Sequence, residues 1–132
     1  MASTKADKLT GPRPLKWLDK IAVITGASSG IGAATARKFA RQGMHVILVA
    51  RRRDRLEELA DEIGLSGGKT SIIAADLSNE ADRERVFAQV EAEYGQVDVL
   101  VNNAGLGWYG FSTDMPWTIA SEILQVNIAA AV

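Results

Sequence analysis

Short apolar runs alternate with longer amphipathic segments along this chain, and the apolar runs recur at nearly equal intervals. Each run is rich in valine and isoleucine and shows no polar alternation, which is typical of strands that a parallel sheet buries on both faces. The pattern therefore predicts four strands, within residues 20–26, 45–51, 70–76 and 97–102.

The segments between these runs carry small and apolar residues at the 3.6-residue spacing of helices. Residues 32–43 and 56–63 show this spacing, and Gly64 is expected to stop the second of these helices. A last helical pattern begins near Pro116, which suits a first helical turn, and continues to the end of the chain.

A further helix is predicted before the fourth strand, with Phe87, Val90 and Tyr94 on its apolar face. Ser78 or Asn79 can cap the amino terminus of this helix. The acidic side chains of Glu80 and Asp82 then lie near its positive end, which favours negative charge.

Strands that alternate with helices in this way predict an α/β fold, a doubly wound parallel sheet of the Rossmann type with right-handed crossovers. We expect residues 1–18 to form a polar, disordered tail, with a partner-binding arm as the alternative, and residues 19–132 to form the folded domain. The last helical pattern has no stop signal, so we expect a sheet truncated after the fourth strand and part of the next helix.

Composition narrows the classes of function. The 132 residues suffice for one domain, and a formal net charge of −1 gives no general attraction to nucleic acid or to an anionic membrane. No apolar run is long enough to span a bilayer, the first residues do not resemble a signal peptide, and cysteine is absent. We therefore expect a cytoplasmic protein without disulfides or a metal site.

Three glycines follow the first strand at a spacing that suits phosphate binding. Gly26 allows a sharp turn, Gly30 lets a pyrophosphate approach the backbone, and Gly32 lets the next helix pack closely. The helix that begins here offers free N–H groups, and Ser28 and Ser29 can add donors. The alternative is a plain glycine–serine turn without a ligand.

The end of the second strand indicates which dinucleotide binds. An NAD site places Asp or Glu here for the ribose 2′-hydroxyl, whereas this chain has Ala50 followed by Arg51 and Arg52. Guanidinium groups bind a 2′-phosphate that a carboxylate would repel, so the sequence predicts NADP(H). The alternative is a solvated start of the next helix, which we expect for Arg53.

Four motifs in this order resemble the short-chain dehydrogenase/reductase family over residues 20–132. They are TGASSGIG at 25–32, Asp76 with Leu77 after the third strand, NNAG at 102–105 and Val126 with Asn127 in the last helix. The candidate cofactor-binding residues are Gly26, Ser28, Ser29, Gly30, Ile31, Gly32, Arg51, Arg52, Asp76, Leu77, Asn103, Ala104 and Gly105.

The resemblance implies an NADP(H)-dependent oxidoreductase that transfers hydride between nicotinamide and a carbonyl or alcohol substrate. It assigns Asp76 to the adenine amino group, although this carboxylate could simply cap a turn. It also implies that the backbone of Asn103, Ala104 and Gly105 approaches the cofactor and that Asn127 is a catalytic residue in a proton relay. Family members often form homodimers or homotetramers.

Other polar and aromatic residues fall outside these motifs. Asn102 is expected to tie strands together, and His45 is expected to be structural because it starts the second strand, away from the predicted cleft. Trp108, Tyr109 and Phe111 follow NNAG and are expected either to line an apolar substrate pocket or to pack in the core.

The family's catalytic YxxxK pattern is absent from this sequence, since Asp98 lies four residues after Tyr94 and Thr113 lies four residues after Tyr109. We therefore expect the 132-residue chain to be inactive alone. Two alternatives to an enzyme stay open: a non-catalytic NADP(H)-binding sensor or scaffold, and an interaction protein that kept the sheet without the ligand.

Overall fold

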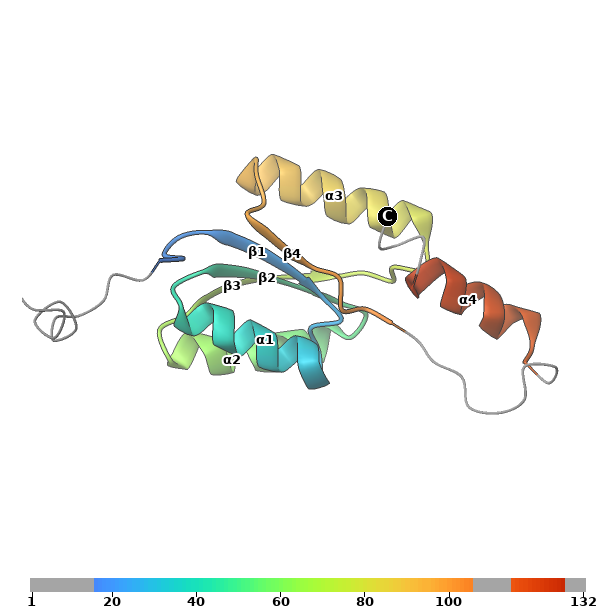
Figure 1. Ribbon diagram of the computed structural model, residues 1–132, viewed down its shortest axis with the longest axis horizontal. Helices are drawn as coiled ribbons and strands as arrows, with labels where there is room; N and C mark the ends of the chain where they lie inside the picture. Colours follow the sequence, from blue (N-terminus) through green and yellow to red (C-terminus); the bar gives the residue numbers. More distant parts are fainter. Residues whose placement is uncertain (1–15, 106–114, 128–132) are drawn as a thin grey trace, which may run out of the picture.

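The computed structural model describes residues 16–105 and 115–127 as a parallel sheet flanked by helices (Figure 1). Each pair of neighbouring strands runs parallel, and the strand order is β3-β2-β1-β4. This confirms the predicted doubly wound sheet. The strands are β1 (Ile21–Thr25), β2 (His45–Ala50), β3 (Lys69–Ala74) and β4 (Val99–Val101).

Helices lie on both faces of the sheet. Two of them cover one face, a third covers the other, and the fourth lies beside the carboxyl ends of the strands (Figure 1). In that order they are α1 (Gly30–Arg41), α2 (Arg53–Leu65), α3 (Glu80–Tyr94) and α4 (Trp117–Asn127). None of the helices in these described ranges combines the length and the hydropathy needed to cross a bilayer.

The core has two layers because successive side chains of each strand point to opposite faces. Val46 and Leu48 of β2 pack with α1 and α2, whereas Ile47 and Val49 face α3. All four side chains are fully buried. Burial on both faces explains why the strand reads as an unbroken apolar run.

The ends of α2 and α3 follow local rules of capping. Gly64 does not stop α2, contrary to expectation: the helix continues to Leu65, and Gly67 takes the left-handed conformation at φ +84°. The cap of α3 is Asn79, whose side chain accepts the N–H of Asp82. Helices commonly end just before a left-handed residue, and Gly67 provides one after α2.

The start of β4 and one residue of α3 differ from the sequence pattern. The β4 ladder begins at Val99, later than expected, because the carboxylate of Asp98 accepts the N–H of Ile21 at 2.8 Å. Phe87 is 69% exposed and is not part of the core face of α3, although Val90 and Tyr94 are. The expectation for Phe87 was wrong.

Thr25 links the ends of β1 and β4. Its hydroxyl oxygen accepts the backbone N–H groups of Asn103 and Ala104, each at 3.0 Å, and it donates to the carbonyl of Val101 at 3.4 Å. A single buried hydroxyl therefore fixes where the chain goes after β4.

His45 belongs to a polar cluster at the opposite end of the strands. Its Nε2 lies 2.8 Å from Ser71 Oγ, which in turn lies 2.5 Å from the Tyr94 hydroxyl. The rings of His45 and Tyr94 stack edge to face at 5.1 Å. The position of His45 at the start of β2, remote from the carboxyl ends, agrees with the structural role expected for it.

We expect Thr25→Val to lower the free energy of unfolding by about 1–3 kcal/mol, because valine keeps the shape but leaves two partly buried N–H groups without their acceptor. Thr25→Ser retains the hydroxyl and is the control. Urea unfolding followed by circular dichroism measures both variants. Equal unfolding midpoints for the two would contradict the linking role of the hydroxyl.

Burial of His45, aided by the charge of Lys69, holds the pKa of its imidazole below the usual value. As the pH falls, the His45 imidazole therefore takes up a proton in the unfolded chain before it does so in the folded protein. The contribution of neutral His45 to the free energy of unfolding is present above about pH 6.5 and is lost as the pH falls below that value. We expect the wild-type protein to lose more stability between about pH 7 and pH 5 than His45→Gln does. Parallel slopes in urea titrations across this range would show that His45 is not the group responsible.

Candidate functional site

A pocket of about 340 Å³ opens at the carboxyl edge of the sheet. It draws on the segments that follow all four strands and on one residue of α4. In open α/β sheets this edge is where ligands bind. The lining residues are Gly26, Ser28, Ser29, Ala50, Arg51, Arg52, Arg55, Ala75, Asp76, Leu77, Asn103, Ala104, Gly105 and Val126.

The amino terminus of α1 is an uncapped helix end beside this pocket. Ser29 stands at the N-cap position with extended backbone, yet its side chain makes no capping hydrogen bond, and the first turn has no acidic residue. Among the described residues, no acceptor pairs with the N–H groups of Gly30, Ile31 or Gly32. Free N–H groups at the positive end of a helix form an anion site.

The three glycines of this loop have different surroundings. A Cβ on Gly26, which has φ +63°, would lie 2.9 Å from the backbone of Ala104, and a Cβ on Gly32 would collide with the Gly26 carbonyl oxygen. Gly30 has φ +57° and nothing within 4 Å of its Cβ position. Gly26 and Gly32 therefore permit close packing, whereas Gly30 leaves open space at the helix end.

Arginines form the basic side of the pocket. Arg51 and Arg52 line it as predicted, and Arg51 also pairs with Glu122 of α4 at 3.5 Å. Arg53 instead pairs with Glu57 at 3.7 Å and is not among the lining residues, in agreement with its expected solvated position.

Arg55 also lines the pocket, and the sequence prediction missed it. It lies in the first turn of α2, which begins at Arg53 just beyond the end of β2. Its place beside the pocket depends on the orientation of α2, which the sequence pattern does not indicate.

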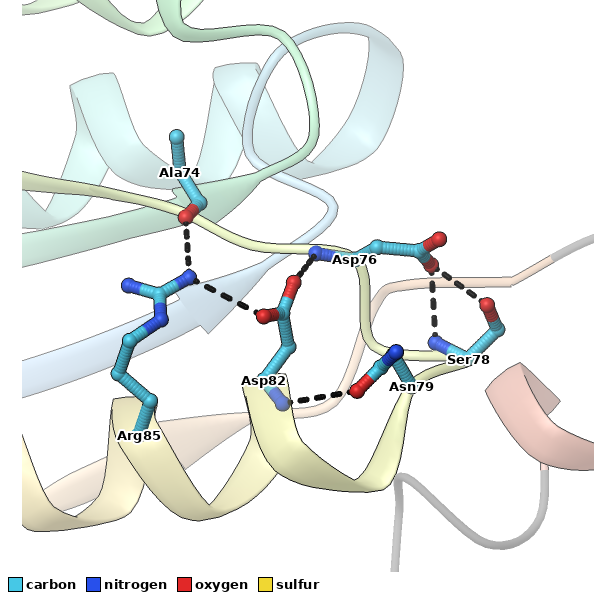
Figure 2. Close-up of polar contacts among 6 residues, drawn as sticks. All are labelled: Ala74, Asp76, Ser78, Asn79, Asp82 and Arg85. Atoms are coloured by element: carbon cyan, nitrogen blue, oxygen red, sulfur yellow. Dashed lines mark hydrogen bonds and ion pairs between the residues drawn. The ribbon is translucent and has the colours of Figure 1, made fainter.

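Asp76 both caps a turn and lines the pocket. Its Oδ1 accepts from the N–H of Ser78 at 3.0 Å and from the hydroxyl of Ser78 at 2.6 Å (Figure 2). The side-chain bond from Ser78 lowers the pKa of this carboxyl; burial opposes it, and the Ser78 N–H and the Arg51 guanidinium reinforce it. The group is therefore an ionised acceptor, and the two expected roles are compatible.

The segment after β4 packs against the glycine loop. The side-chain amide of Asn103 donates to the carbonyl of Gly26 at 3.2 Å. The expectation that Asn102 makes such a tie was wrong, because Asn102 is exposed and Asn103 makes the bond. Gly105 lies beside α4, where its missing Cβ would be 3.4 Å from Asn127 Oδ1.

Other candidate residues lie apart from the pocket or outside the described residues. Ile31 is 77% exposed in the first turn of α1 and does not line the pocket. The hydroxyl of Tyr94 is bonded to Ser71 at the other end of the strands, so it does not belong to the pocket. The three aromatic residues expected after NNAG lie outside the described residues: Trp108, Tyr109 and Phe111.

Sequence comparisons identify relatives of this chain. The family model for the short chain dehydrogenases matches residues 20–132. A farnesol dehydrogenase of Aedes aegypti is 47% identical over 122 residues, which cover 89% of this chain and 49% of that protein. The human dehydrogenase/reductase SDR family member 11 is 43% identical over 69% of this chain and 36% of its own length. The chain thus spans half or less of these relatives.

Solved structures give the same picture. A metagenomic short-chain oxidoreductase in complex with NADP is 40% identical with a TM-score of 0.83, over 87% of this chain and 53% of that one. The L-sorbose reductase of Gluconobacter frateurii, complexed with NADPH and L-sorbose, is 35% identical with a TM-score of 0.84, over 90% and 46% of the two chains. With the glycine loop, the Asp76 turn and the NNAG segment meeting at one sheet edge, this chain belongs to the short-chain dehydrogenase/reductase family.

Proposed function

We propose that this chain is the NADP(H)-binding part of an oxidoreductase acting on a small carbonyl or alcohol compound. The observation that carries the proposal is one pocket that brings together an uncapped helix end, three arginines and an ionised carboxylate. These groups match the parts of the cofactor in turn: the pyrophosphate, the 2′-phosphate and the adenine amino group.

The preference for NADP(H) rests on the end of β2. Ala50 stands where an NAD site has a carboxylate, and Arg51, Arg52 and Arg55 line the same pocket. Two of the similar solved structures are described as complexes with NADP or NADPH. Ser28 and Ser29 line the pocket as well and can donate to phosphate oxygens.

The bound cofactor would donate hydride to a carbonyl or accept it from an alcohol, and the residues of this chain would hold and orient the cofactor. The segment of Asn103, Ala104 and Gly105 would support the nicotinamide side, because small residues there allow the backbone to approach. Asn127 lies beside Gly105. This position fits the role in a proton relay that the family resemblance implies, so we retain Asn127 as the candidate catalytic residue.

We expect the protein to bind NADPH about one to two decades more tightly than NADH, because a charged contact with the 2′-phosphate contributes roughly 1.5–3 kcal/mol. Ala50→Asp combined with Arg51→Ala should reverse the preference. Arg53→Ala removes a neighbouring charge outside the pocket and should leave it unchanged. Isothermal titration calorimetry gives each Kd. Equal or tighter binding of NADH by the wild-type protein would disprove the 2′-phosphate assignment.

Gly30→Val should weaken NADPH and NADH together, because a branched side chain would occupy the open space at the end of α1. Valine at a positive φ also strains the backbone, by roughly 1–2 kcal/mol. Gly67→Val is the matched control, since Gly67 also has a positive φ and an open Cβ position but lies after α2, away from the pocket. Unchanged binding by folded Gly30→Val would contradict the phosphate assignment.

A further inference from the structure

Several hydrogen bonds hold the residues that follow β3, and Figure 2 shows those around Asp76. Ser78 occupies Oδ1 of Asp76, and the N–H of Asn79 donates to the Asp76 carbonyl at 3.0 Å. Arg83 donates to the carbonyl of Leu77 at 2.9 Å. The first turn of α3 therefore fixes the backbone of the two residues assigned to the adenine ring.

Asp82 completes this arrangement with an unusual capping bond. In a capping box, the acidic residue at the third helical position accepts the N–H of the cap residue itself. Here the N–H of Asn79 is engaged by Asp76, and Oδ2 of Asp82 accepts the N–H of Asp76 at 2.7 Å. Oδ1 of Asp82 pairs with Arg85 at 3.5 Å, and Arg85 also donates to the carbonyl of Ala74 at 2.8 Å.

Oδ2 of Asp76 and the N–H of Leu77 have no partner among the described residues. Figure 2 shows Oδ2 turned away from Ser78. One is an acceptor and the other is a donor, on adjacent residues that both line the pocket. The Watson–Crick edge of adenine presents the complementary pair, the N6 amino donor and the N1 acceptor.

We propose that Asp82 is a positioning residue for adenine recognition. It does not touch the nucleotide; its carboxylate holds the N–H of Asp76 so that Oδ2 of Asp76 and the N–H of Leu77 face the base together. A hydrogen bond to a charged acceptor is stronger than a neutral one, so this contact fixes the segment firmly. The inference rests on the proposed dinucleotide function and adds the origin of its base specificity.

The test compares NADPH with its hypoxanthine analogue, in which a keto oxygen replaces the amino group and N1 carries a hydrogen. That base presents an acceptor to Asp76 and a donor to Leu77. We expect the wild-type protein to prefer NADPH about tenfold or more. Asp82→Ala should reduce the ratio of the two Kd values to within about threefold, mainly by weakening NADPH. A merely structural role would weaken both dinucleotides equally and leave the ratio unchanged.

Two further variants distinguish the positioning role of Asp82 from the effect of its negative charge and from its effect on the stability of α3. Asp82→Asn keeps an acceptor oxygen for the N–H of Asp76 and should retain most of the preference for adenine. Glu80→Ala removes the same charge from the same turn, where Glu80 is exposed, and should leave the ratio unchanged. Loss of the ratio in Glu80→Ala, or its retention in folded Asp82→Ala, would overturn the inference.

A measurement on the wild-type protein covers the case in which Asp82→Ala does not fold. By amide hydrogen exchange, the N–H of Asp76 should be protected without ligand, and that of Leu77 should become protected only when NADPH is added. Rapid exchange at Asp76 without ligand would overturn the role of Asp82. Equal affinity of the wild-type protein for NADPH and the analogue would overturn the adenine contact alone, whereas failure to bind either would overturn the proposed function as well.

Discussion

The close approach of two backbone segments is the constraint on which the pocket depends. The loop after β1 and the segment after β4 meet with so little space that a Cβ on Gly26 or Gly32 would strike backbone or amide atoms. The hydroxyl of Thr25 and the amide of Asn103 then fix this contact by hydrogen bonds. Because β1 lies between β2 and β4 in the sheet, any shift here would move the glycine loop relative to every other wall of the pocket.

The amino termini of two helices beside the pocket differ in charge. This difference separates the helix end that can bind an anion from the one that holds neighbouring backbone in place. The amino terminus of α1 has neither a cap nor an acidic residue, so its positive potential is directed outward. The amino terminus of α3 is neutralised by Asn79 and Asp82, and its groups bind the neighbouring backbone. One fold thus uses the same local structure once to attract an anion and once to hold a recognition segment in place.

The sequence was informative where a residue type has one physical meaning. Unbroken apolar runs predicted the strands, and glycines at fixed spacing predicted the loop, because both depend on local chemistry. The sequence was less informative where the position or partner of a side chain depends on residues that are distant in the chain but close in space. Arg55 reaches the pocket through the orientation of α2, and Asn103 bonds Gly26 where Asn102 was expected to make the tie. Phe87 shares the helical spacing of Val90 but is left exposed on α3.

The long sequence separation across the pocket has a consequence for folding. Thr25 meets its partners in and just after β4 across 76 to 79 residues, whereas β1 pairs with β2 and β2 pairs with β3, the next strand along the chain in each case. Closing so large a loop costs chain entropy that is repaid only when β4 docks, so we expect the pocket to form late in folding. An intermediate in which only β1, β2 and β3 are paired would have secondary structure, but its pocket would lack the segment that follows β4. Any molecule that binds the pocket would therefore stabilise only the chain in which β4 has joined the sheet.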